Sequence, residues 1–87
     1  MEFEYDPNKS DTNREKHGID FARAQLLWAD ERRLVVPARS STESREALIA
    51  TLGGVYWTAV YTMRGPAVRI ISVRRSRDEE REGYNNR

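Results

Sequence analysis

Hydrophobic and polar positions divide the first part of the chain into a short strand and two helices of opposite character. Residues 2–5 are typical of a strand, and the Asp6-Pro7 pair that follows is typical of a helix start. The first helix runs to about residue 17, where Gly18 supplies a left-handed stop. It has no apolar side chain between residues 8 and 17. A helix that is polar all round is either marginal or present for a reason other than core packing.

The second helix is amphipathic and is expected to cover the core. Asp20 can cap it, and it spans residues 21–29. Its apolar residues at core spacing are Phe21, Ala24, Leu27 and Trp28.

Three strands are predicted next, at residues 34–36, 45–52 and 55–63. The Gly53-Gly54 pair predicts a two-residue hairpin, which places Ala50 opposite Trp57. Alternation then assigns one face to the core and the other to solvent. The core face holds Leu48, Leu52, Val55, Trp57, Ala59 and Tyr61. The polar face holds Arg45, Thr51, Tyr56, Thr58 and Thr62.

The turn at residues 64–66 decides which arginines of the last strand share the polar face. A three-residue loop puts Val73 on the core face with Trp57, and puts Arg74 on the polar face. A two-residue loop instead moves Arg69 and Arg75 to the polar face, because a slip of one residue exchanges every side chain. We prefer the three-residue loop, because it keeps Trp57 with Val73 and pairs polar with polar residues.

A short helix is predicted at the C-terminus, where Ser76 and Glu79 have the spacing of a capping box. Tyr84 is almost its only apolar residue, and it is either an anchor for the helix or a phenol placed near phosphate. The pattern as a whole predicts one α+β domain over residues 1–87. It comprises an antiparallel sheet, two N-terminal helices packed on one face and the short C-terminal helix.

Composition excludes several classes of protein and site. With 87 residues and no cysteine, the chain cannot carry a disulfide framework, a thiolate nucleophile or a sulfur zinc site. The single histidine, His17, excludes a multi-histidine metal site, and no metal or cofactor is expected. The chain has no apolar run long enough to cross a membrane and no signal-peptide layout, so a cytoplasmic protein is expected.

Charge is the most informative feature after the hydrophobic pattern. Residues 64–77 contain five arginines and no acidic residue, and 13 of the 15 basic residues are arginines. These five are Arg64, Arg69, Arg74, Arg75 and Arg77. Arginine holds phosphate through two parallel hydrogen bonds, so the run indicates a polyanion-binding surface. A solvated charged face is the alternative.

The available side chains suit RNA cleavage without a metal. The chain has no phosphate-binding glycine loop, no serine elbow and no dense acidic cluster. In metal-free cleavage the ribose 2′-OH attacks the phosphate, and the protein need only position it, neutralise charge and transfer protons. Histidine, glutamate, lysine or tyrosine could act as acid or base. From the residues alone, plain nucleic-acid binding remains the alternative.

Three segments resemble BrnT-type toxins, in the right order and spacing. The first comprises Tyr5-Asp6, Lys9, Asn13, Lys16-His17-Gly18-Ile19, Phe21 and Ala24. The second is Val60-Tyr61-Thr62-Met63-Arg64-Gly65, and the third is Arg69-Ile70-Ile71-Ser72-Val73-Arg74-Arg75 followed by Glu80-Arg81 and Tyr84. The resemblance implies a RelE-like fold and a ribonuclease toxin of a type II toxin–antitoxin pair. It also implies a BrnA-like ribbon-helix-helix antitoxin that binds DNA for the complex, and a higher-order toxin–antitoxin assembly.

The resemblance also implies the site. Its catalytic positions correspond to Lys16, His17, Arg64, Arg74, Arg75 and Tyr84. Arg45, Arg69 and Arg77 are expected to bind RNA. In the working mechanism Arg64 and either Arg74 or Arg75 clamp the scissile phosphate. His17 or Lys16 is the base or an electrostatic stabiliser, and Tyr84 or an arginine assists the leaving group. A degenerate toxin that only binds its antitoxin is a further alternative.

Overall fold

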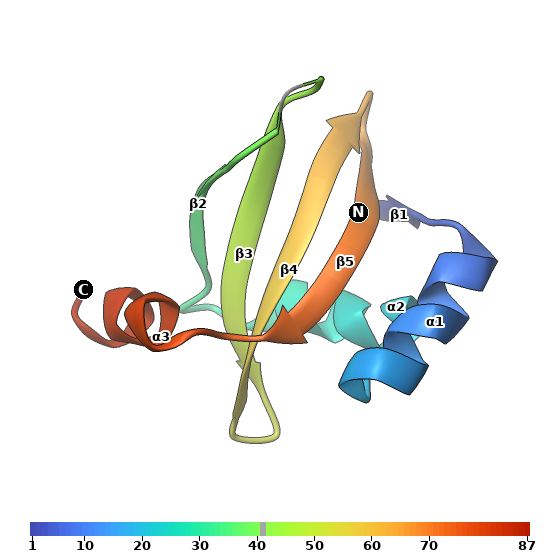
Figure 1. Ribbon diagram of the computed structural model, residues 1–87. Helices are drawn as coiled ribbons and strands as arrows, with labels where there is room; N and C mark the ends of the chain where they lie inside the picture. The colour runs from blue at the N-terminus through green and yellow to red at the C-terminus, as the bar shows by residue number, and fades with distance from the viewer. Residues whose placement is uncertain (41) are drawn as a thin grey trace.

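A twisted five-stranded sheet organises the protein (Figure 1), and its strand order is β1-β5-β4-β3-β2. The computed structural model describes residues 1–40 and 42–87. The strands are β1 (Glu2–Glu4), β2 (Leu34–Ala38), β3 (Arg45–Leu52), β4 (Val55–Arg64) and β5 (Ala67–Arg75). The helices are α1 (Pro7–His17), α2 (Phe21–Ala24), the 3-10 helix η1 (Gln25–Ala29) and α3 (Asp78–Asn85). The α+β class is therefore confirmed. No helix in this part of the chain has the length and apolar character needed to span a membrane.

The sheet is mixed, so the prediction of an antiparallel sheet is wrong at one edge. Strand β1 runs parallel to β5, with Glu2 opposite Ala67, whereas the other three pairings are antiparallel. Parallel neighbours need a long crossover, and here α1, α2, η1 and three strands lie between them in sequence. Alternation along a three-residue strand carries no information on strand direction, which is why the sequence did not reveal this pairing.

The β3–β4 hairpin has the predicted register. Gly53 and Gly54 have φ angles of 59° and 80°, the left-handed conformation that a tight two-residue hairpin turn requires. Leu52 therefore lies opposite Val55, and Ala50 lies opposite Trp57.

The β4–β5 hairpin combines features of both predicted registers. Its turn has two residues, because Arg64 lies opposite Ala67, so the preferred three-residue loop is wrong. An irregularity in the pairing at Val60 and Tyr61 then leaves Ile71 without a partner, and beyond it Val73 lies opposite Ala59. This is a β-bulge, and it reverses the alternation of β5 halfway along the strand.

The bulge allows both halves of β5 to bury apolar side chains on the same face. Val68 and Ile70 before it are each 2% exposed, and Val73 after it is fully buried. The same reversal places Arg69 opposite Thr62 and Arg74 opposite Thr58, on the other face. The predicted face of Arg74 is therefore confirmed, although its partner residue differs.

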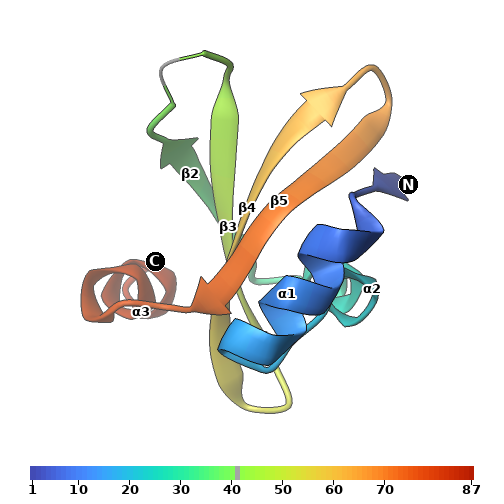
Figure 2. The same ribbon diagram turned by 45° about the vertical axis from the view of Figure 1, so that its right-hand side comes forward.

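The apolar core lies between the sheet and the second helical segment. Phe21 and Leu27 are 1% and 0% exposed and pack against the predicted core face of β3 and β4. The predicted helix over residues 21–29 divides into the α-helical turn of α2 and the 3-10 helix η1. By contrast, α1 lies beside β5 (Figure 2), and its two buried residues are the polar Ser10 and Asn13. The predicted packing of two N-terminal helices on one face of the sheet therefore holds for α2 and η1 but not for α1.

The C-terminal helix covers part of the face that was expected to be wet. On this face Thr58 is fully buried and Ile49 is 1% exposed, and α3 and α1 flank the sheet, with α3 beside β3 and α1 beside β5 (Figure 1). The helix begins one residue later than predicted, because Arg77 is the N-cap and Glu80 accepts its backbone N–H at 2.8 Å. The carboxylate of Glu80, not that of Glu79, therefore caps the first turn.

Candidate functional site

A groove of about 310 Å³ lies between α1 and the middle of β5. Two of the predicted catalytic residues, Lys16 and His17, line it from the last turn of α1. Gly18, with a φ angle of 83°, ends the helix directly after them. The full lining is Asn8, Lys9, Thr12, Asn13, Lys16, His17, Ile71 and Ser72. The groove therefore joins the basic end of a polar helix to the bulged strand.

Asn13 fixes the helix to the strand. Its side-chain amide donates to the carbonyls of Ile19 and Val73 at 2.8 and 2.9 Å, and its Oδ1 accepts the Val73 N–H at 3.1 Å. Strand β1 pairs only with residues 67–69, so Asn13 satisfies edge groups of β5 beyond the end of β1. Ser10 adds a second tie by accepting the N–H of Phe21 at 2.9 Å. Polar anchoring thus explains how α1 can lack an apolar face.

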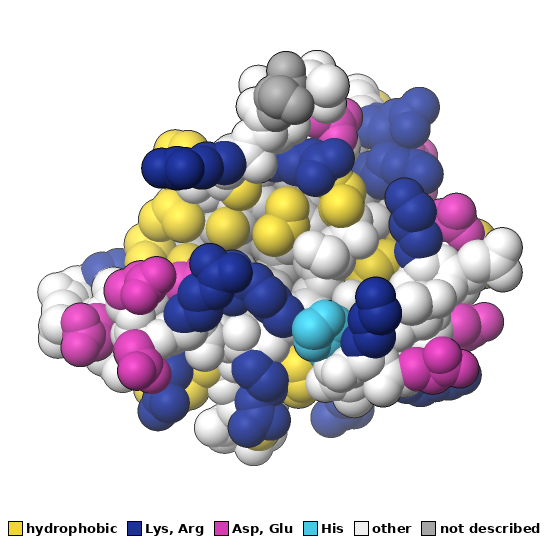
Figure 3. Space-filling view, viewed as in Figure 1, with side chains coloured by type: hydrophobic (Ala, Val, Ile, Leu, Met, Phe, Trp, Pro, Cys, Tyr) yellow, Lys and Arg dark blue, Asp and Glu magenta, His cyan; other side chains and the backbone are white. Residues whose placement is uncertain are grey.

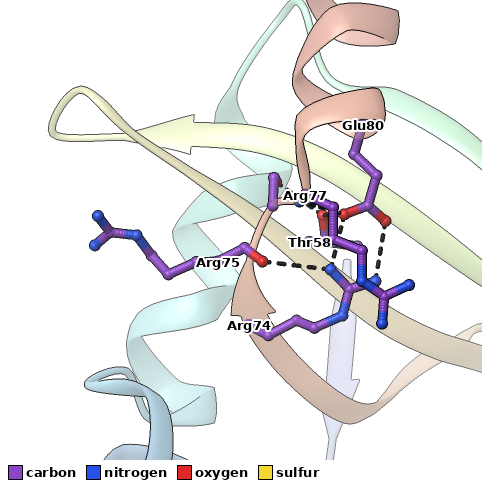
Figure 4. A network of polar contacts seen from close by, with 6 residues as sticks. Thr58, Arg74, Arg75, Arg77 and Glu80 are labelled. Carbon is purple, nitrogen blue, oxygen red and sulfur yellow. Dashed lines mark hydrogen bonds and ion pairs between the residues drawn. The ribbon is translucent and has the colours of Figure 1, made fainter.

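Arg74 lies on the same face of β5 as Ser72, and an acidic residue of α3 holds its guanidinium group (Figure 4). Its Nη1 and Nη2 donate to Oε1 and Oε2 of Glu80 at 2.7 and 3.0 Å, which is a two-pronged pairing. The carboxylate also accepts the hydroxyl of Thr58 at 3.1 Å. The pair is largely shielded, because the Arg74 and Glu80 side chains are 26% and 16% exposed.

Glu80 remains ionised over the whole pH range in which RNA cleavage would be studied. Burial raises the pKa of its carboxyl group, but hydrogen bonds from Arg74, the Arg77 backbone and Thr58 outweigh it and lower the pKa to about 2. The same hydrogen bond to Glu80 raises the pKa of Arg74. The ion pair is therefore a constant feature of the site near neutral pH.

Arg75 and Arg77 lie close to Arg74 in the chain but are not held in this way. The side chain of Arg75 points away from that of Arg74 (Figure 4), and its guanidinium carbon lies 5.5 Å from the centre of the Trp57 ring. Arg77 is the exposed N-cap of α3. We name Lys16, His17, Arg74, Arg75 and Arg77 the strand-end cluster.

Arg45, Arg64 and Arg69 form a second basic group, the turn-end cluster, at the other end of the sheet. Arg64 and Arg69 share Glu4, at 3.4 and 3.5 Å, and Arg45 pairs with Glu43 at 3.1 Å. On the face of the molecule that Figure 3 shows, basic side chains lie toward both ends and apolar side chains lie between them.

Arg64 and Arg74 cannot hold the same phosphate, so this part of the working mechanism is wrong. Arg64 lies six residues from Thr58 in β4, and Thr58 lies opposite Arg74. At about 3.3 Å per residue, this separation is roughly 20 Å. The hairpin register therefore assigns the two arginines to different contacts.

Tyr84 is an anchor for α3 in this structure. It is 6% exposed, its ring packs edge-on to that of Tyr56, and its hydroxyl donates to Oδ2 of Asp30 at 2.7 Å. The same Asp30 oxygen also accepts the N–H of Thr51 at 2.9 Å. Burial and the hydrogen bond to Asp30 raise the pKa of Tyr84. The phenol is thus committed to a partner far from α1, across the sheet.

We expect Tyr84→Phe to lower the free energy of unfolding by about 1–2 kcal/mol, because it removes a buried hydrogen bond to a carboxylate but keeps the ring. The measurement is urea unfolding followed by circular dichroism. Tyr56→Phe is the control, because among residues 1–40 and 42–87 its hydroxyl donates only to the exposed side chain of Asn85. If Tyr84→Phe were as stable as the wild type and more than tenfold slower in RNA cleavage, the predicted catalytic role would replace the anchoring role.

No group of three or more histidine, cysteine, aspartate or glutamate side chains within residues 1–40 and 42–87 could hold a metal ion. The polar side chains that line the groove carry amide, hydroxyl, ammonium and imidazole groups. Ser72 lines it from β5 and was not singled out from the sequence, since a lone serine in a strand carries no signal.

A family model for the ribonuclease toxin BrnT of type II toxin–antitoxin systems matches residues 5–80. The chain belongs to the BrnT family. A search of curated proteins found no match to this BrnT chain. The matched region contains both walls of the groove, the Arg74–Glu80 pair and the turn-end cluster, whereas Tyr84 lies beyond it. Membership makes this BrnT protein a ribonuclease toxin whose partner is an antitoxin.

Proposed function

We propose that this BrnT protein is an endoribonuclease that cleaves RNA without a metal ion, by attack of the ribose 2′-OH on the adjacent phosphate. One observation carries the proposal. The groove combines Lys16 and His17 of α1 with Ser72 of β5, two residues before Arg74 on the same face of the strand. The groove thus carries an imidazole, an ammonium group and a hydroxyl, and Arg74 lies two residues further along the strand face that carries this hydroxyl.

In the proposed reaction the imidazole of His17 takes the proton from the 2′-OH. The 2′-oxygen forms a bond to phosphorus while the bond from phosphorus to the 5′-oxygen breaks. Lys16 supplies the proton for the departing 5′-oxygen. His17 then gives its proton to solvent and Lys16 takes one from solvent, which restores both groups. Arg74 stabilises the charge that develops on the phosphoryl oxygens. The products are a 2′,3′-cyclic phosphate and a free 5′-hydroxyl end, so atoms and charge balance without an external nucleophile.

The remaining arginines are assigned to the rest of the RNA strand. Arg75 and Arg77 follow Arg74 in the chain, and although the Arg75 side chain points away from that of Arg74, both would bind adjoining phosphates. The turn-end cluster would bind phosphates further along the strand, since its member Arg64 lies roughly 20 Å from Arg74. An RNA strand that spans the two clusters would place its bases on the apolar side chains that lie between them.

The antitoxin is proposed to be a BrnA-like ribbon-helix-helix protein, with acidic side chains where it covers the arginines. Contact with DNA would come only through this partner, within a higher-order complex. A RelE-like fold and action on RNA in the cytoplasm belong to the same proposal. With α2 on one face of the sheet and α3 covering only part of the other, the uncovered part of the second face, which carries Arg69 and Arg74, would receive RNA or antitoxin.

Incubation of the purified protein with RNA in excess EDTA tests the proposal. We expect cleavage with 2′,3′-cyclic phosphate ends, seen by mass spectrometry of the fragments, and loss of cleavage in His17→Ala. The control is Arg23→Ala, an exposed residue of α2 outside both clusters.

Three results would contradict the proposal in different ways. Cleavage that appears only after magnesium is added would exclude the metal-free scheme. RNA binding without cleavage would favour the non-catalytic alternative, and normal growth on induction without an antitoxin would favour a degenerate toxin.

A further inference from the structure

We infer that Glu80 is a positioning residue. It binds the end of the Arg74 guanidinium group and so directs one side edge of that group toward phosphate. This inference rests on the proposed function and adds a residue to its machinery. Glu80 lies on α3, whereas the groove is built by α1 and β5, so α3 would act on the site through a single arginine.

The hydrogen bonds of Arg74 account for three of its five N–H groups. Nη1 donates to Glu80 Oε1 at 2.7 Å and to the backbone carbonyl of Arg75 at 3.3 Å. Nη2 donates to Glu80 Oε2 at 3.0 Å. Within the described part of the chain, the Nε–H and the second N–H of Nη2 have no protein acceptor. No buried side-chain nitrogen or oxygen lacks a partner there, so the Nε atom is open to solvent.

The two unused N–H groups lie on one edge of the guanidinium plane. In arginine the Nε–H and the outer N–H of Nη2 are nearly parallel, and this edge can hold two oxygens of one phosphate. Glu80 occupies the end of the fork and Arg75 the opposite edge, so only the side edge is left. Arg74 can therefore bind Glu80 and a phosphate at the same time.

The carboxylate that holds Arg74 is itself fixed from two elements. Oε1 of Glu80 accepts the backbone N–H of Arg77 at 2.8 Å and the hydroxyl of Thr58 at 3.1 Å. Thr58 is fully buried in β4 and contacts Ser76 through its hydroxyl at 2.8 Å. Arg74 thus meets phosphate with its rotamer already selected, which reduces the entropy lost on binding and keeps its alignment in the transition state.

The test compares Glu80→Gln with Glu79→Gln. Both remove one negative charge near Arg74, but only Glu80 is hydrogen-bonded to it. We expect Glu80→Gln to lower kcat for RNA cleavage roughly 10- to 100-fold with KM changed less than threefold, and Glu79→Gln to leave both unchanged. In an Arg74→Ala background, Glu80→Gln should have no further effect on kcat, because its action passes through Arg74.

A second readout does not depend on activity. In protein labelled with ¹⁵N-arginine, the Nε–H signal of Arg74, assigned by its absence in Arg74→Lys, should shift on titration with 2′-O-methyl RNA, which cannot be cleaved. The shift should be weaker in Glu80→Gln at equal saturation. Circular dichroism establishes that each variant is folded.

The outcomes separate this inference from the proposed function. If the wild type cleaves RNA and Glu80→Gln retains its kcat, or lowers kcat equally with and without Arg74, the positioning role is overturned and the ribonuclease stands. If the wild type does not cleave RNA, the proposed function fails. In that case, or if Glu80→Gln does not fold, an Arg74 Nε–H signal unmoved at saturation in the wild type overturns the inference.

Discussion

Arg74→Lys is expected to lower kcat for RNA cleavage by about 10²- to 10³-fold, the usual loss when one donor to a developing oxyanion is removed. Lysine keeps the positive charge but cannot hold Glu80 with two parallel bonds and also offer a second edge to phosphate. The measurement is single-turnover cleavage of a short RNA in EDTA, below the melting temperature of the variant.

Arg23→Lys makes the same chemical change on α2, outside both clusters, and should cleave like the wild type. If Arg74→Lys cleaved RNA within threefold of the wild-type rate, charge alone would suffice at this position. The assignment of Arg74 to the scissile phosphate would then fail.

Asn13→Ala is expected to lower the free energy of unfolding by about 3 kcal/mol. The substitution leaves buried backbone groups of β5 and of the α1–α2 link without hydrogen-bond partners. Asn13 is 6% exposed and makes three hydrogen bonds, two of them to Val73. In a domain of this size the loss corresponds to a fall of roughly 15 °C in melting temperature. Differential scanning calorimetry and urea unfolding provide the two estimates.

Glu15→Ala is the matched control, since Glu15 is exposed on the same helix and alanine has a similar helix propensity. We expect its melting temperature to stay within about 2 °C of the wild type, as is usual for an exposed substitution. A drop below about 1 kcal/mol for Asn13→Ala would mean that α1 is held mainly by other contacts. The position of Lys16 and His17 would then need another explanation.

The predictions for Arg74 and Asn13 concern different parts of the same candidate site. Asn13 fixes the helix that carries Lys16 and His17, and Glu80 holds Arg74, which shares a strand face with the groove residue Ser72. Both contacts join segments far apart in the chain. Asn13 and Val73 are separated by 60 residues, so no local pattern could pair them.

The candidate site was predicted in part. The motif residues Lys16 and His17 do line one groove, and alternation correctly placed Arg74 and Arg75 on opposite faces. The grouping of Arg64 with Arg74 failed, because the distance between them depends on the whole length of the hairpin. The pairing of Arg74 with Glu80 depends on which residue caps α3, since a shift of one residue would bring a different glutamate to this place.

The sequence by itself determined the local features of this BrnT protein. Asp6, Gly18 and the Gly53-Gly54 pair set the helix ends and the β3–β4 register, because capping and left-handed turns depend on neighbouring residues alone. The motifs of residues 5–80 likewise sufficed for the family.

Only the tertiary structure decided the parallel pairing of β1, the bulge at Ile71 and the use of each arginine. Burial of Val68, Ile70 and Val73 against one helical face requires β5 to change its alternation midway. That requirement arises from packing between distant segments, and the same bulge sets the face on which Arg74 meets Glu80. The alternation of residues within one strand gives no information about packing between distant segments.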